Sequence, residues 1–180
     1  IAVTILDDTP PEPEVEQANA IFSAAKNASC DMVVGVGGGS AIDCAKAIGI
    51  VHANGCDIGA MEGADQVEMP GPPLICIPTT AGTAADISQF CIVVNSLKRY
   101  EMAIISKTVV PDAALVDPEC TLTMDRYLTA CTGIDALTHA VEAFVSTASS
   151  PVVDVHALAA IKLVWQNIEQ AVAVPHDLTA

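Results

Sequence analysis

The sequence predicts an α/β domain with a parallel sheet, followed by the start of an all-helical domain. Two observations carry this expectation. Short apolar runs alternate with helical patterns over residues 1–118, as in sheets whose strands are joined by helices. Residues 119–180 instead contain two long helical patterns with no strand between them. We therefore expect two domains, at 1–118 and 119–180.

Apolar runs bounded by turn residues predict the strands. They lie at residues 1–6, 32–36, 74–77 and 113–116, and the runs at 87–94 and 101–105 predict an antiparallel hairpin. The run at 32–36 is almost continuously apolar, which is typical of a parallel strand with both faces covered. Residues 54–73 are rich in glycine and acidic side chains, so we expect a surface excursion there.

Apolar residues at helical spacing predict the helices. They lie at residues 14–28, 126–145 and 152–174, and a further helix begins at Ala41 and ends near His52. Pro118 and Pro151 precede the two helical patterns of the second domain, in keeping with the preference of proline for helix starts.

Three consecutive glycines separate the strand at 32–36 from the helix that follows it. Gly37, Gly38 and Gly39 leave the backbone open, and the N–H groups of a helix start can then face a phosphate. Ser40 is expected to cap the helix, with Asp43 three residues later in the position of a capping-box acid. A capped turn without a ligand is the alternative interpretation.

A second polar turn follows the strand at 74–77. Its hydroxyls, from Thr79, Thr80 and Thr83, could bind a ribose or a nicotinamide amide. Ligands bind beyond the carboxyl ends of parallel strands, so we expect both polar turns to face one crevice. Threonines after a strand are also ordinary turn residues.

Asp135 and His139 stand four residues apart in a predicted helix, so their side chains share one face. A carboxylate and an imidazole at this spacing can share a cation, although an ordinary Asp–His pair is the alternative. Zn or Fe requires at least three protein ligands, so these two residues make only half of a site.

The composition excludes several classes of function. Seven Lys and Arg against 22 Asp and Glu give a net charge of -15, which repels nucleic acid and anionic membranes. No apolar run reaches the length of a membrane helix. Seven cysteines without a C-x-x-C pair are typical of reduced thiols, so we expect a cytoplasmic protein.

Four segments resemble, in the same order, the motifs of the iron-containing (group III) alcohol dehydrogenases. They are GGGSAIDCAK at 37–46, IPTTAGTAADIS at 77–88, PDAALVDPE at 111–119 and TACTGIDALTHAVEAF at 129–144. The resemblance runs over nearly all of residues 1–175. This family is similar to glycerol dehydrogenase and, more distantly, to dehydroquinate synthase.

The resemblance implies a Rossmann-like domain that binds NAD or NADP and a helical domain that binds Fe²⁺, or alternatively Zn²⁺. By position, the turn of Gly37, Gly38, Gly39 and Ser40 would hold the pyrophosphate, with Asp43 in the same unit. Thr79, Thr80 and Thr83 would contact other parts of the cofactor. Asp135 and His139 would be two of four metal ligands, with no further catalytic residue implied.

The implied activity is the interconversion of a small alcohol and its aldehyde or ketone. We expect a piece of a longer chain, incomplete at both ends and inactive alone, whose full-length form is a homo-oligomer. A hydroxyacid-oxoacid transhydrogenase and a non-catalytic nucleotide-binding homologue are the alternatives. Two departures from the family motifs bear on them: Asp86 replaces a common glutamate, and Glu101 replaces a common lysine.

Overall fold

The computed structural model describes residues 2–7, 9, 15, 30–96 and 98–179. Its strands are β1 (Val33–Gly37), β2 (Gly63–Ala64), β3 (Leu74–Pro78), β4 (Phe90–Asn95), β5 (Tyr100–Ile105) and β6 (Ala113–Ala114), and its helices are α2 (Gly39–Asn54), α3 (Arg126–Val145) and α4 (Pro151–Ala173). The chain divides into two compact units, residues 1–78 with 84–116, and residues 79–83 with 117–180. Each unit is described by itself.

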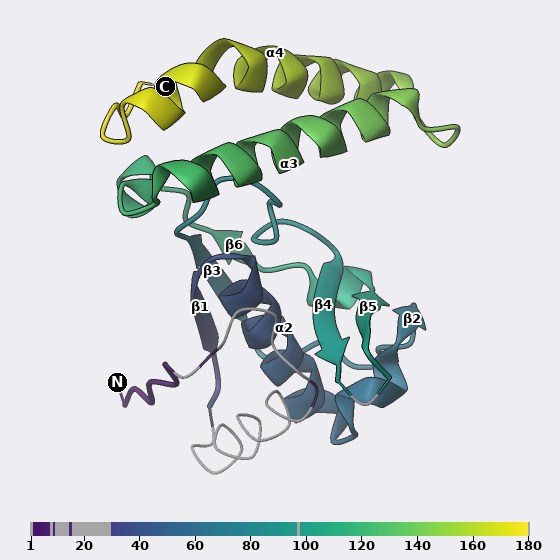
Figure 1. Ribbon diagram of the computed structural model, residues 1–180. Coiled ribbons are helices and arrows are strands. Elements are labelled where there is room, and N and C mark those ends of the chain that lie inside the picture. The colour runs from purple at the N-terminus through teal and green to yellow at the C-terminus, as the bar shows by residue number, and fades with distance from the viewer. Residues whose placement is uncertain (1, 8, 10–14, 16–29, 97, 180) are drawn as a thin grey trace. The chain divides into compact units, whose positions relative to one another are not determined.

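The first sheet confirms the predicted parallel strands. Its order is β1-β3-β6, and both pairs of neighbours are parallel. The register sets Val33 opposite Leu74 and Gly37 opposite Pro78, so β1 and β3 end level with one another. Helix α2 contacts β1 and β3, and Figure 1 shows it running beside them.

One face of this sheet is exposed, which corrects the expectation that both faces of the strand at 32–36 are covered. Gly35 is buried toward α2, but Val34 and Val36 on the other face are 51% and 58% exposed. A parallel strand needs a helical layer on each side. The described residues supply such a layer on one side only.

The second sheet contains the predicted hairpin. Its order is β2-β5-β4, with β4 antiparallel to β5 and β2 parallel to β5. Strand β4 begins at Phe90 rather than at residue 87. The preceding residues form a turn, in which the Ile87 N–H donates to the Ala84 carbonyl at 3.1 Å.

Residues 54–73 are only partly a surface excursion, which corrects a second expectation. Within this segment Ile58, Met61 and Val67 are buried and join the main apolar core, together with Met102 and Ile104 of β5. Strand β2 also lies in the segment. Glycine and acidic residues dominate its composition, but three apolar side chains anchor it to the core.

The N-terminal segment does not form the strand expected at residues 1–6. Residues 2–7 have no regular secondary structure, and Val3 and Ile5 are 76% and 77% exposed. A strand requires a partner for its backbone hydrogen bonds, and no described strand pairs with this segment. The helix expected at 14–28 lies outside the described residues, apart from Val15.

The second unit is built around two adjacent helices, α3 and α4, which run side by side in Figure 1. Asp125 caps α3 by accepting from the Leu128 N–H, and Ser150 caps α4, where Pro151 is the first helical residue. The predictions at 126–145 and 152–174 are confirmed. Among the residues described, no helix combines the length and apolar character needed to cross a bilayer.

Candidate active site

The glycine turn connects β1 to α2 through a backbone that side chains would obstruct. Gly37 has φ +147°, and a Cβ added to it would lie 2.7 Å from the Ala41 Cβ. The capping residue of α2 is Gly38, whose carbonyl accepts from the Ile42 N–H at 3.1 Å. Because a glycine cap has no side chain, the first N–H groups of the helix keep room for an anion.

The expected capping roles of Ser40 and Asp43 are wrong. Helix α2 begins at Gly39, so Ser40 lies inside its first turn rather than at the cap. The Asp43 carboxylate does not return to the helix start. Its Oδ2 instead accepts from the Ile92 N–H of β4 at 3.2 Å, because burial next to that strand offers it a backbone donor.

Lys46, which sequence reasoning did not single out, is the buried partner of Asp43. Its Nζ lies 3.9 Å from the Asp43 Oδ1, and Lys46 is 1% exposed. Burial raises the pKa of the Asp43 carboxyl to about 6, although the Lys46 charge and the Ile92 N–H both act to lower it. Burial lowers the pKa of the Lys46 ammonium. The sequence feature that could have indicated this pair is a lysine one turn after an aspartate in an otherwise apolar helix.

The threonine turn follows β3 and groups with the second unit. Thr79 and Thr80 are half-buried and Thr83 is exposed. Gly82 lies close to α3, since a Cβ added to it would be 2.8 Å from the Thr132 Cβ. Directly after the turn Ala84 has φ +54°, a left-handed conformation that non-glycine residues rarely adopt.

The Asp135 and His139 side chains lie together on α3. The Asp135 Oδ2 is 3.6 Å from the His139 Nδ1, and the two side chains are 42% and 55% exposed. That same oxygen is buried and has no hydrogen-bond partner. A buried carboxylate oxygen beside an imidazole nitrogen suits Fe²⁺ or Zn²⁺ in donor type. The described residues hold no group of three or more His, Cys, Asp or Glu for a metal.

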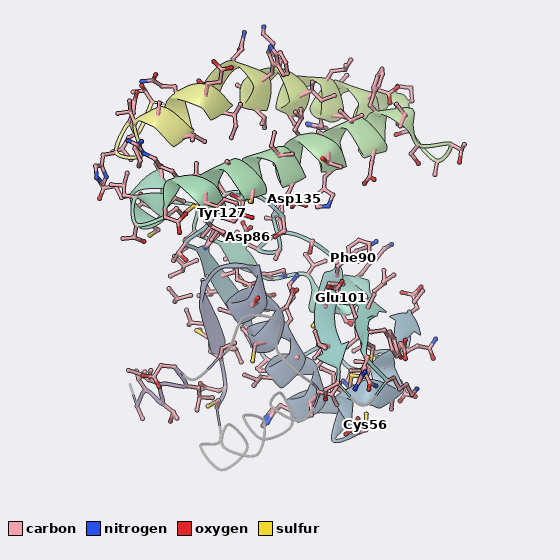
Figure 2. The ribbon with its side chains drawn as sticks, in the orientation of Figure 1. Cys56, Asp86, Phe90, Glu101, Tyr127 and Asp135 are labelled. Atoms are coloured by element: carbon pink, nitrogen blue, oxygen red, sulfur yellow. The ribbon has the colours of Figure 1, made fainter. Side chains whose placement is uncertain are left out.

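The two departures from the family motifs differ in environment. Asp86 is 7% exposed, and its charge acts to raise the pKa of the Lys46 ammonium. Glu101 is exposed on β5, and Figure 2 shows it in the hairpin with Phe90. Figure 2 also shows Asp135 on α3. The structure therefore buries Asp86 and leaves Glu101 at the surface.

The sequence matches two family descriptions that together span most of the chain. Residues 1–118 match "Iron-containing alcohol dehydrogenase". Residues 129–180 match "Fe-containing alcohol dehydrogenase family, C-terminal".

Individual proteins of known name and structure are also similar to this chain. Alcohol dehydrogenase 4 of Schizosaccharomyces pombe is 44% identical over 96% of this chain and 41% of the relative. A crystal structure of 1,3-propanediol oxidoreductase matches with a TM-score of 0.94 and 36% identity, over 98% of this chain and 46% of that chain. Sulfoacetaldehyde reductase from Bifidobacterium kashiwanohense, in complex with NAD+, has a TM-score of 0.92 and 34% identity, over 98% and 47%. The chain thus spans less than half the length of these relatives.

Proposed function

Because the chain belongs to the iron-containing alcohol dehydrogenase family, we propose that its full-length protein interconverts a small alcohol and its aldehyde or ketone with NAD or NADP. The arrangement of Asp135 and His139 carries the proposal. A dehydrogenase of this kind needs oxygen and nitrogen donors for its metal. The Asp135 Oδ2, which has no hydrogen-bond partner, lies 3.6 Å from the His139 Nδ1 and supplies one of each.

Each part of the site has a role in the proposed reaction. The N–H groups at the glycine turn (Gly37, Gly38, Gly39 and Ser40) bind the cofactor pyrophosphate, and Asp43 belongs to the same loop-helix unit. The hydroxyls of Thr79, Thr80 and Thr83 contact the remainder of the cofactor. When bound, the metal would supply Lewis-acid activation of the alcohol oxygen and NAD(P) would supply the hydride acceptor.

Asp135 and His139 hold the metal, Fe²⁺ or alternatively Zn²⁺, as two of its ligands. Their oxygen and nitrogen leave coordination positions for other protein ligands and for the substrate oxygen. We expect the 180-residue chain by itself to bind metal weakly and to lack useful turnover, because its described residues supply only this pair.

The test combines metal content with activity in the full-length protein. We expect about one Fe or Zn per chain, and the loss of both metal and NAD(P)-dependent alcohol oxidation in Asp135→Ala and His139→Ala. Asp154→Ala on α4 is a matched control for carboxylate loss and should keep its metal. A wild-type protein that binds nucleotide but contains no metal and oxidises no alcohol would favour a non-catalytic homologue instead.

We also propose that the full-length protein is a homo-oligomer, a dimer or larger. Many apolar side chains are exposed on the described surface, including Val155, Leu163 and Trp165 of α4. Light scattering coupled to size-exclusion chromatography measures the mass directly, and a monomeric mass would contradict this proposal.

A further inference from the structure

Strand β4 lies at the edge of its sheet, and side chains of α2 bond that edge. In an antiparallel ladder, alternate residues turn their N–H and C=O groups away from the partner strand. At two such positions the Phe90 carbonyl accepts from the Lys46 Nζ at 2.7 Å, and the Ile92 N–H donates to the Asp43 Oδ2 at 3.2 Å. One acid and one base therefore bond the edge of β4 as a neighbouring strand would.

The bonds of Lys46 extend beyond the strand. Its Nζ also donates to the Ser88 carbonyl at 2.9 Å and to the Ser88 Oγ at 3.2 Å. All three hydrogens of the ammonium thus have acceptors. Since Lys46 spans from α2 to both Ser88 and Phe90, it fixes the helix against the start of β4.

The two charges depend on one another. The Asp43 Oδ1 is buried and has no hydrogen-bond partner, so the Lys46 charge at 3.9 Å is its main compensation. Removing the Lys46 charge leaves the Asp43 carboxylate buried and unbalanced, which is costly. The pair therefore acts as a unit.

Helix α2 is held on its other side by close contact with β1. A Cβ added to Gly35 would lie 2.9 Å from the Ala45 Cβ. The helix is thus bounded by β1 through a glycine contact and by β4 through the Asp43–Lys46 pair. Both constraints act within the first two turns, directly after the glycine turn.

We propose that Asp43 and Lys46 are positioning residues for the cofactor phosphates: by bonding the edge of β4, they hold the N–H groups at the start of α2 in place. The inference rests on the proposed function, because it requires a phosphate-bearing cofactor at the glycine turn. Asp43 acts in it through the backbone and not by touching phosphate, which a carboxylate would repel.

The experiment measures the affinity of the full-length protein for two probes by isothermal titration calorimetry. ADP-ribose carries the pyrophosphate, whereas adenosine has no phosphate. We expect Asp43→Asn and Lys46→Met each to raise the Kd for ADP-ribose about tenfold, with the Kd for adenosine unchanged. The Kd of the double variant for ADP-ribose should rise by less than the product of the two single-variant fold-changes, because the double variant leaves no unbalanced charge.

Asp31→Asn and Lys107→Met are the matched controls, since both residues are exposed in the same unit. Equal weakening of both probes would show a general loss of structure and overturn the inference, as would unchanged affinity for ADP-ribose. Asp43→Asn is isosteric and decides the question by itself if Lys46→Met does not fold. A wild-type protein that binds neither ADP-ribose nor NADH overturns the proposed function itself, a result distinct from either of these.

Discussion

Two regions of the chain each place an acid and a base one helical turn apart, and their surroundings give the pairs different roles. Asp43 and Lys46 of α2 are 12% and 0% exposed at their side chains, and both bond the backbone of β4. Asp135 and His139 of α3 are 42% and 55% exposed, with a carboxylate oxygen left unbonded. Local spacing brings each pair together, but burial decides whether it serves packing or remains available to a ligand.

The helices that carry these pairs differ in the same way. Ten of the sixteen residues of α2 are buried, because β1, β3 and β4 all contact it. Helices α3 and α4 pack mainly on one another, and each has a single buried residue, Ala140 or Ala157. The first unit thus encloses a core of its own, whereas the described residues of the second leave much apolar surface exposed.

The largest expected effect separates the two pairs. Lys46→Met should lower the free energy of unfolding by about 3–5 kcal/mol, since it leaves the Asp43 carboxylate buried without its partner. His139→Ala should change it by less than about 1 kcal/mol in the metal-free protein, because solvent screens an exposed pair. Urea denaturation of the full-length protein measures both. Equal losses at the two sites would contradict the comparison.

A second test addresses the cores. Met102→Ala should cost about 2–5 kcal/mol of unfolding free energy, because Met102 is fully buried among apolar side chains. Trp165→Ala, at a side chain 74% exposed, should cost about 0.5 kcal/mol or less in the 180-residue chain. The same denaturation measurement applies. A much larger loss at Trp165 in the full-length protein would show that other residues cover this part of α4.

A third test uses the pH dependence of stability. The pKa of Asp43 is about 6 in the folded protein, above its usual 3.8, so between these values the folded state binds a proton that the unfolded state does not. This group therefore adds stability as pH falls from about 6 toward 4, by roughly 2–3 kcal/mol. Asp43→Asn should lack this increment in unfolding experiments at pH 7, 5 and 4. If the free energy of unfolding changes with pH in the same way in the variant and the wild type, Asp43 does not make this contribution.

The smallest effects concern two glycines in close contacts. Gly35→Ala should destabilise the protein by about 1–3 kcal/mol, because its Cβ would meet the Ala45 Cβ, which cannot rotate away. Gly133→Ala should cost less, about 1 kcal/mol, because the atom it would meet is the Ile168 Cδ1 at the end of a flexible side chain. Thermal unfolding of both variants ranks them, and the reverse order would show that α3 and α4 cannot adjust.

Much of the secondary structure follows from periodicity alone. The helix at 126–145 and the hairpin have patterns that repeat over enough residues to be read locally. Residues 1–6 have a strand pattern too, but the strand is absent because a β-strand needs a partner elsewhere. Ile58 and Met61 look like loop residues in the sequence, and only the three-dimensional packing shows that they belong to the core.

For the candidate site, the sequence by itself determined which chemical groups are present and which of them share a turn or a helix face. The glycine turn and the meeting of Asp135 with His139 depend on residues close in the chain, so backbone geometry suffices to predict them. Only the tertiary structure decided that Asp43 turns to Ile92 and Lys46 to Phe90, 49 and 44 residues away. A side chain bonds whichever partner folding brings within reach, and burial then makes that bond obligatory.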